Sequence, residues 1–301
     1  MRIVSLLPSA TETLCALGLA EQIVGISHKC DYPNHITNRP RLTRSALRED
    51  LASEEIHRRV RESAADRARL YTLDSELLAS LQPDLIVTQD QCSVCAVGED
   101  DVEPAVRLSG CQPRVVVLRA THLGEVMDDI GRLGSATGRK EAAAALIGRM
   151  QMRLNELRRR TAQARRPRVF CLSWFKPLMA ASHWMTDIVG LAGGVDRLGA
   201  RDGASSLLEP TRLASYDPET IFLMPCDFGL ERTVREWQDQ TIQTICRDLT
   251  AVRNGRVYAV KGSLFHRPGP RLLDGVELLA SVLHPLRVRR GYSADAIRKV
   301  A

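Results

Sequence analysis

Short apolar runs alternate with segments of helical periodicity in the first part of the chain. The apolar runs have the length of buried strands, and the segments between them place apolar residues on one face of a helix. Strands that alternate with helices are typical of a parallel sheet covered by helices, so residues 1–121 are predicted to form one βα lobe. In chain order the segments are RIVSLL, TETLCALG, QIVGIS, SEEIHRRVRESA, DLIVTQ, DDVEPAVRL and RVVVL.

Residues 122–165 interrupt this alternation. They contain no strand pattern and keep apolar residues at helical spacing, as at Leu146, Met150 and Leu154. The pattern predicts one long connecting helix with a jog near Gly138.

The alternation of strand and helix patterns resumes after residue 165, so residues 166–301 are predicted to form a second βα lobe. The expected fold class is α/β: two Rossmann-like lobes with parallel sheets, joined by one long backbone helix. In open parallel sheets ligands bind beyond the carboxyl ends of the strands. We therefore expect the ligand site in a cleft between the lobes, lined by the loops that follow strands.

Composition narrows the class of protein. The 301 residues are 44% hydrophobic and 26% charged, which is typical of folded soluble proteins. No run approaches the roughly 18 apolar residues that span a bilayer, so no membrane span is predicted. The net charge is +6, but all except five of the 42 basic residues are arginines scattered along the chain. With only 4% aromatic residues, this distribution does not favour a nucleic-acid partner.

Three loops of the first lobe follow predicted strands and carry polar groups. Ser9 and Glu12 have the spacing of a capping box, and the free amides of that helix terminus can also hold a ligand. The next loop brings an imidazole, a carboxylate and a phenol into a few residues. The candidate ligand-binding residues of this lobe are Pro8, Ser9, Thr11, His28, Asp31, Tyr32 and Gln89.

Four of the eight cysteines fall in loops that follow predicted strands. Cys92 and Cys95 form a C-x-x-C pair, a motif that serves zinc, iron–sulfur clusters and redox exchange alike. Together with Cys30 and Cys226 they give four thiols on loops expected at one cleft, a set that suits zinc or an iron–sulfur cluster. The alternative is that these cysteines are small neutral fillers.

The second lobe adds flat side chains to the same expected cleft. Aromatic groups mixed with a few polar ones suit a large planar organic ligand. No serine nucleophile elbow, P-loop, G-x-G-x-x-G after the first strand, or H-E-x-x-H motif is present, so no catalysis is predicted. The candidate ligand-binding residues of this lobe are Trp174, His183, Trp184, Phe228, Phe265 and Arg267.

Several segments together resemble the cobalamin and iron-siderophore solute-binding proteins of ABC importers, and most of all the cobalamin-binding branch. The similarity covers nearly the whole chain, and it implies the helical-backbone clamp already expected, with the ligand between two lobes. The segments that carry it are RIVSLLPSATETLCALGL, SHKCDYP, PDLIVTQDQCSVCAV, ASHWMTDIVGLAGG, NGRVYAVKG and RPGPRLLDGVELLA.

The resemblance implies a non-catalytic protein that clamps a corrinoid such as cobalamin, with His28 or His183 near the metal and Trp174 or Trp184 over the ring. A second hypothesis is an intracellular metalloprotein on the same fold, with an iron–sulfur cluster or zinc on the four loop cysteines. A third is a ferric siderophore or haem carrier, for which Arg267 is one of the few cations near the cleft. An ABC permease is the partner expected of an exported member, and the sequence does not indicate an oligomeric state.

The expected location is the cytoplasm. The apolar run at Ile3 to Leu7 has neither a charged region before it nor a cleavage site after it, unlike a signal peptide. Eight cysteines in such a chain are expected to stay reduced. A periplasmic or surface-anchored protein would require a start upstream of Met1.

Overall fold

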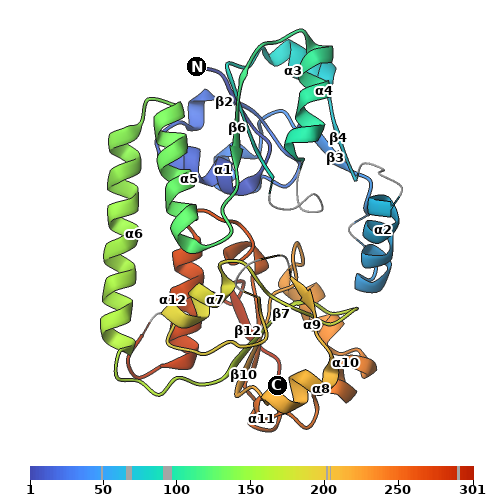
Figure 1. Ribbon diagram of the computed structural model, residues 1–301, viewed down its shortest axis with the longest axis vertical. Coiled ribbons are helices and arrows are strands. Elements are labelled where there is room, and N and C mark those ends of the chain that lie inside the picture. Colours follow the sequence, from blue (N-terminus) through green and yellow to red (C-terminus); the bar gives the residue numbers. More distant parts are fainter. Residues whose placement is uncertain (49, 66–69, 91–96, 201–202, 204, 290–291) are drawn as a thin grey trace. The chain divides into compact units, whose positions relative to one another are not determined.

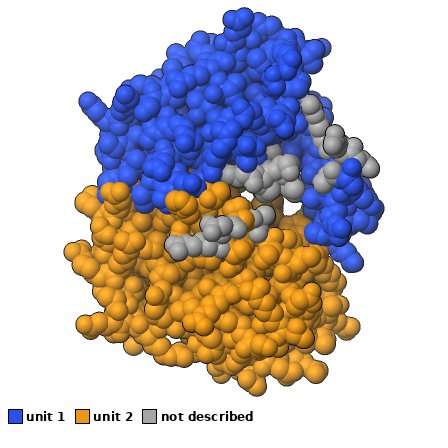
Figure 2. Space-filling view, in the orientation of Figure 1, with its two compact units in different colours: residues 1–120, 124–149 blue, residues 121–123, 150–301 orange. Residues whose placement is uncertain are grey.

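The computed structural model describes residues 1–301 except 49, 66–69, 91–96, 201–202, 204 and 290–291. The chain divides into two compact units, coloured separately in Figure 2. Unit 1 comprises Met1–Ala120 and Gly124–Arg149, and unit 2 comprises Thr121–Leu123 and Met150–Ala301. No helix in the described part of the chain is both long and apolar enough to cross a membrane.

Unit 1 is built on a four-stranded parallel sheet with strand order β2-β1-β5-β6 (Figure 1). The central strands are buried because helices cover both faces of a parallel sheet. The sheet strands are β1 (Ile3–Ser5), β2 (Ile23–Ile26), β5 (Leu85–Gln89) and β6 (Arg114–Leu118), and the short helices of this part are α1 (Pro8–Ala16), η1 (Ala20–Gln22), η2 (Asn34–Ile36), α3 (Ser75–Leu81) and α4 (Glu99–Ser109).

Helix α1 does not begin with the predicted capping box. Pro8 is its first residue, Leu7 is the N-cap, and no side chain caps the terminus. Proline suits this position because its fixed φ is helical and its missing N–H needs no partner. Ser9 is therefore already inside the helix, where its carbonyl accepts the hydroxyl of Thr13 at 2.8 Å.

A second, two-stranded antiparallel sheet pairs β3 (Thr43–Ser45) with β4 (Tyr71–Leu73). The chain between these strands contains α2 (Ser53–Ala65), the helix predicted from SEEIHRRVRESA. The helix carries ion pairs at helical spacing, with Glu55 Oε1 2.7 Å from Arg58 and 2.6 Å from Arg59.

The predicted long helix over residues 122–165 is instead two helices, α5 (Leu123–Ala136) and α6 (Lys140–Thr161). The break lies at Gly138, which has a φ of 69°. This left-handed conformation ends a helix and favours glycine, so the glycine marks a turn and not a jog in a continuous helix. The residues of α6 are shared between the two units.

Unit 2 is built on a six-stranded sheet with strand order β12-β11-β10-β7-β8-β9. β7, β10 and β11 are parallel neighbours and form its buried centre. Its strands are β7 (Val169–Trp174), β8 (Met179–Ala180), β9 (Ser206–Leu207), β10 (Thr220–Leu223), β11 (Val257–Val260) and β12 (Ile297–Lys299). Its helices are α7 (Met185–Leu191), α8 (Pro210–Tyr216), α9 (Leu230–Trp237), α10 (Gln240–Cys246), α11 (Thr250–Arg253), η3 (Gly262–Leu264) and α12 (Leu272–Leu283).

The sheet of unit 2 is mixed, whereas a parallel sheet was predicted. β8 pairs antiparallel to β7, β9 to β8, and β12 to β11. Only residues 175–178 join β7 to β8, a connection too short for the helical crossover that parallel strands require. The α/β character and the three parallel central strands agree with the prediction.

Candidate functional site

The carboxyl ends of the parallel strands of unit 2 carry several of the candidate side chains. β7 ends at Trp174, β10 is followed by residues 225–229, and β11 leads through η3 to Phe265. β10 pairs in parallel with both of the other strands, so all three end at the same edge of the sheet. This is the edge at which open α/β sheets bind ligands.

Trp174 and Phe228 form an aromatic platform at this edge. Their ring centroids lie 5.0 Å apart at an interplanar angle of 55°. Trp174 is partly exposed, and its indole N–H donates to the carbonyl of Lys176 at 3.1 Å, which fixes the ring. The guanidinium of Arg232 lies 3.4 Å from the centroid of the Phe228 ring, a cation–π contact.

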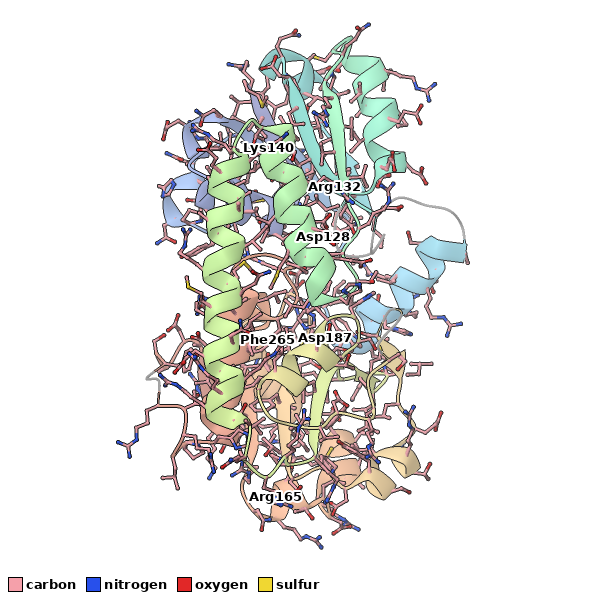
Figure 3. The ribbon with its side chains drawn as sticks, turned by 60° about the vertical axis from the view of Figure 1, so that its left-hand side comes forward. Asp128, Arg132, Lys140, Arg165, Asp187 and Phe265 are labelled. Atoms are coloured by element: carbon pink, nitrogen blue, oxygen red, sulfur yellow. The ribbon has the colours of Figure 1, made fainter. Side chains whose placement is uncertain are left out.

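A second aromatic group lies where β8 leads into α7. The indole N–H of Trp184 donates to the carbonyl of Phe265 at 2.6 Å, which ties this segment to the loop after β11. The imidazole of His183 stacks on Trp184 with centroids 5.5 Å apart and an angle of 24°. Asp187, labelled with Phe265 in Figure 3, accepts the amide of Leu123 at 3.3 Å from the first turn of α7.

His183 is held in an unusual state. Its φ is 57°, a left-handed conformation that few residues other than glycine adopt. Its Nδ1 is buried and has no hydrogen-bond partner among the described residues. Burial lowers the pKa of His183, so the ring is neutral near pH 7 and carries a nitrogen lone pair.

His266, which follows Phe265, is the second imidazole of this edge. Its Nε2 contacts the carbonyl of Met224, and because a carbonyl only accepts, Nε2 carries the proton. Burial lowers the pKa of His266, against the opposing effects of the Met224 carbonyl and Asp227. The ring therefore leaves Nδ1 as its unprotonated nitrogen. The next residue, Arg267, is half-buried.

The predicted loop residues of unit 1 divide into buried and exposed ones. Thr11 is fully buried, and its hydroxyl lies 2.8 Å from the Ser5 hydroxyl and 3.0 Å from the Cys30 thiol. The Cys30 thiol also lies 3.2 Å from the Ser27 hydroxyl. These four side chains form a buried polar network that holds the loop after β2 against the start of α1.

His28 lies at the rim of this network and is half-buried. Its Nδ1 is 2.7 Å from the Thr43 hydroxyl, which also accepts the His28 amide at 2.9 Å. Its ring is tilted against Tyr71, with centroids 5.6 Å apart. Of the other candidates, Asp31 and Tyr32 are exposed, Pro8 is half-buried, and Ser9 and Gln89 are buried.

The predicted four-cysteine metal site finds no support. Cys92 and Cys95 lie outside the described residues, Cys30 belongs to the network of unit 1, and Cys226 lies at the edge in unit 2. Within the described ranges, no group of three or more His, Cys, Asp or Glu side chains is arranged to hold a metal ion.

Three further residues, Arg232 and His266 of unit 2 and Asp129 of unit 1, were not predicted from the sequence. Arg232 is four residues after Phe228, and that spacing was the available signal for their contact. His266 lies between two predicted residues, Phe265 and Arg267, but was not itself predicted. Asp129, whose position on a predicted helix suggested a solvated face, is buried and accepts the amides of Arg119 at 3.2 Å and Ala120 at 3.1 Å.

The sequence and the fold of this chain are both similar to those of known proteins. The sequence model of a family described as periplasmic binding protein matches residues 3–264. A vitamin B12-binding protein of Vibrio cholerae is 25% identical over 284 residues, which cover 94% of this chain and 88% of the relative. Among solved structures, the periplasmic vitamin B12 binding protein BtuF of Vibrio cholerae superposes with a TM-score of 0.68 at 22% identity, covering 96% of this chain and 98% of that one.

A periplasmic heme binding protein of Pseudomonas aeruginosa has a TM-score of 0.71 at 18% identity, covering 98% of this chain and 96% of that chain. Structural likeness at such identity shows a shared fold. It confirms the predicted two-lobe α/β fold class.

These matches show that the prediction of a cytoplasmic protein is wrong. The matching family is one of periplasmic binding proteins, and both solved structures are periplasmic, which points to a location outside the cytoplasm. The prediction rested on the first residues of the sequence, which form β1 and α1 of the folded unit and carry no information on the compartment. The inference that the eight cysteines stay reduced loses its basis as well.

Proposed function

Because this chain belongs to the periplasmic binding protein family, we propose that it is a non-catalytic solute-binding protein whose ligand is a corrinoid of the cobalamin type. The family assignment agrees with the resemblance seen in the sequence. The curated relative described as a vitamin B12-binding protein supports the ligand class.

The observation that carries this proposal is the pair of aromatic groups at one edge of the sheet in unit 2. The partly exposed Trp174 packs on the buried Phe228, and the partly exposed His183 stacks on the buried Trp184. Flat apolar surfaces with few polar groups suit a large planar ring such as a corrin. Burial keeps the partly exposed His183 ring neutral, so one of its nitrogens is unprotonated, and we propose this ring as the group nearest the cobalt.

The charges at this edge favour an amide-bearing ring over an anionic chelate. Arg232 stacks on Phe228 and lies 3.7 Å from Glu236, and Lys176 pairs with Asp239 at 2.7 Å. These cations already have protein partners, whereas capture of an anionic chelate needs several convergent cations for the ligand. Haem is the second candidate, because neutral imidazoles such as His183 and His266 suit iron.

The carboxyl edge of the sheet in unit 1 is the second candidate surface, through His28, Asp31 and Tyr32. We propose an ABC permease as the partner that receives the ligand, as expected for a solute-binding protein. The predicted zinc or iron–sulfur alternative is not part of this proposal.

The test is a titration with cyanocobalamin followed by absorbance and calorimetry. We expect saturable binding, and we expect Trp174→Ala to weaken it by about tenfold, equivalent to about 1.4 kcal/mol, because the ring loses one aromatic surface. Met152→Ala on α6 is the matched control, since that apolar side chain is 65% exposed and outside the edge.

Two outcomes would count against the corrinoid. One is that cyanocobalamin and dicyanocobinamide produce neither heat nor a spectral change with the wild-type protein. The other is saturable binding that Trp174→Ala and Met152→Ala leave equally unchanged, which would place the ligand elsewhere. A shifted Soret band on addition of hemin, with no response to either corrinoid, would favour the second candidate.

A further inference from the structure

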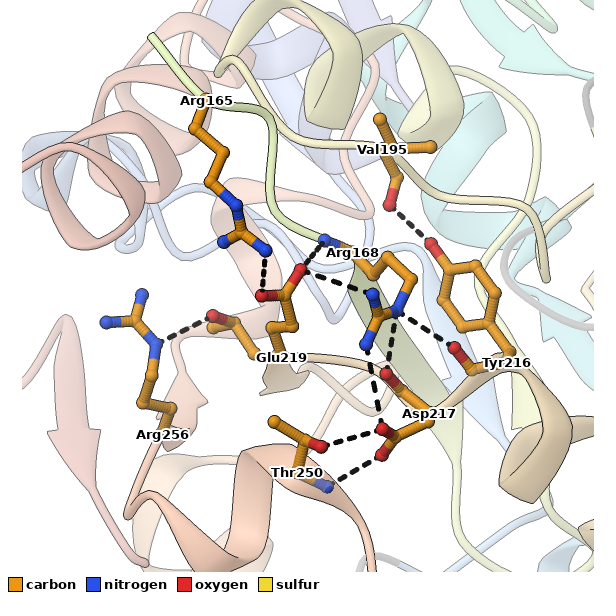
Figure 4. Close-up of polar contacts among 9 residues, drawn as sticks. Arg165, Arg168, Val195, Tyr216, Asp217, Glu219, Thr250 and Arg256 are labelled. Atoms are coloured by element: carbon orange, nitrogen blue, oxygen red, sulfur yellow. Dashed lines mark hydrogen bonds and ion pairs between the residues drawn. The ribbon is translucent and has the colours of Figure 1, made fainter.

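The loop between α7 and β9 is anchored at its base to two elements of unit 2, β7 and α8. The Tyr216 hydroxyl donates to the carbonyl of Val195 at 2.6 Å (Figure 4), and the amide of Val169 donates to the same carbonyl at 2.8 Å. The guanidinium of Arg212 donates to the carbonyl of Arg197 at 3.1 Å. The start of β7 and helix α8 therefore fix the loop up to residue 197.

Residues 196–200 form a turn that rests on the segment carrying His183. The amide of Ala200 donates to the hydroxyl of Ser182 at 3.2 Å. Gly199 lies so close that a Cβ atom there would collide with the carbonyl oxygen of Ala181. Ser182 directly precedes His183 and Trp184, so the 196–200 turn is the support beneath them.

A single carboxyl group organises the 196–200 turn. One oxygen of Asp196 accepts the amide of Leu198 at 2.8 Å and the amide of Gly199 at 3.2 Å. The other oxygen, Oδ2, is buried and has no hydrogen-bond partner among the described residues. A buried carboxylate oxygen without a donor is costly, and a proton on that oxygen removes most of the cost.

We propose that Asp196 is a positioning residue of the ligand site, whose carboxyl group holds His183 and Trp184 in place through the 196–200 turn, and that it holds them most firmly when protonated. This inference rests on the proposed function for the identity of the site. It adds a residue that touches no ligand and a dependence of the site on pH.

Burial and the groups that face Asp196 together decide whether the turn is more stable at low or at high pH. Burial raises the pKa of Asp196 to about 6, against the two turn amides and the positive charge of Arg212. Tyr216 on α8 and Cys171 on β7 also face it, and burial raises the pKa of both, so they stay neutral near pH 7. A carboxyl with a raised pKa stabilises the fold below its ordinary pKa and loses that contribution as pH rises through about 6.

The test is amide hydrogen exchange of the ligand-free protein between pH 5 and 8, corrected for the intrinsic pH dependence of exchange. Linkage predicts that the wild-type turn opens about tenfold more often at pH 8 than at pH 5. The change is expected at the hydrogen-bonded amides of residues 198–200 and at the amide of Met185, which follows Trp184 and donates to the carbonyl of Ser182 at 3.2 Å. Asp196→Asn, which cannot ionise, should give protection that does not change with pH.

Asp217→Asn is the matched control, because that aspartate also accepts a backbone amide, that of Thr250 at 2.7 Å, but lies outside the turn. It should leave the pH dependence at residues 198–200 as in the wild type. Wild-type protection that does not change with pH, or a slope that persists in Asp196→Asn, would overturn the proposal. So would a response of the turn that the amide of Met185 does not share.

Binding supplies the second readout. The affinity for cyanocobalamin at pH 8 should be higher in Asp196→Asn than in the wild type, and the two should converge at pH 5. A higher wild-type affinity at pH 8 would contradict the proposed direction. Absence of any corrinoid binding would reject the proposed function, while the exchange measurement would still decide the role of Asp196.

Discussion

At the scale of single residues, two aspartates of unit 2 show that surroundings and not residue type decide the charge. Burial raises the pKa of Asp196 to about 6, because one of its oxygens has no donor among the described residues. Hydrogen bonds from Thr250 lower the pKa of Asp217, whose oxygens accept the Thr250 hydroxyl and amide, each at 2.7 Å. The two groups therefore link stability to pH with opposite signs.

The Asp217 contacts in Figure 4 allow a stability prediction. Asp217→Ala should lower the free energy of unfolding by about 1–2 kcal/mol at pH 7, because it removes both bonds to Thr250 and places alanine at a φ of 45°. Asp217→Asn should lose less, since it keeps an acceptor and asparagine tolerates this φ. Urea unfolding at pH 7 measures both.

The pH dependence of this prediction follows from the lowered pKa of Asp217. Its charged form stabilises the fold above the ordinary aspartate pKa of about 3.9, and that contribution is lost as pH falls through the lower folded value. The gap between wild type and Asp217→Asn should therefore narrow in acid. A gap that widens toward pH 3 would show that Asp217 is not stabilised by its charge.

Residue patterns predicted the place of the candidate site better than its contacts. Trp174 and Phe265 follow strands in the sequence, and the structure puts both at the carboxyl edge of one sheet. Thr11 also follows a strand, yet its hydroxyl is hydrogen-bonded within a buried network with Ser5 and Cys30. Position after a strand is readable from periodicity, but the direction of a side chain depends on partners that are distant in sequence.

At the scale of elements, the break between α5 and α6 shows how one glycine overrides a helical pattern. Gly138 has a φ of 69°, and a Cβ atom there would meet nothing within 4 Å. Glycine is therefore favoured at position 138 by the backbone conformation alone and not by a lack of space for a side chain. Gly148, within α6, also has open space around a Cβ atom but has a helical backbone.

This matched pair gives opposite predictions for the same substitution. Gly138→Ala should lower the free energy of unfolding by about 1 kcal/mol, because alanine is strained at a positive φ. Gly148→Ala should raise it by about 0.5–1 kcal/mol, because glycine is a poor helix former. Thermal and urea unfolding of the two variants are the measurements, and equal effects of the same sign would contradict the assignment of the break.

The mixed sheet of unit 2 marks another limit of sequence patterns. A resumed alternation of strand and helix patterns does not give the relative direction of β7 and β8, which depends on the length of the chain between them. A four-residue connection over residues 175–178 forces a hairpin. β12 carries too short and polar a pattern to be predicted, and only its pairing with β11 makes it a strand.

At the scale of the whole molecule, the alternation of strand and helix was sufficient to predict an α/β fold in two parts. That inference works because both periodicities are local and recur along the chain. The compartment was predicted wrongly because it is not a property of the folded chain. The ligand is likewise a property of surfaces that only the folded units create.

The proposed function makes one prediction for the molecule as a whole. A ligand that binds only the folded state stabilises it by about 2.7 kcal/mol at a concentration one hundred times Kd, so cyanocobalamin should raise Tm by several degrees. The shift should grow with the logarithm of ligand concentration and should be smaller for Trp174→Ala, which lacks half of the aromatic platform.

Hemin and a ferric siderophore, titrated in the same way, allow the three ligand classes to be ranked by the increase in Tm that each produces. A Tm that none of these ligands moves would mean that the aromatic edge of unit 2 serves a different partner, since binding to the folded state cannot occur without this stabilisation.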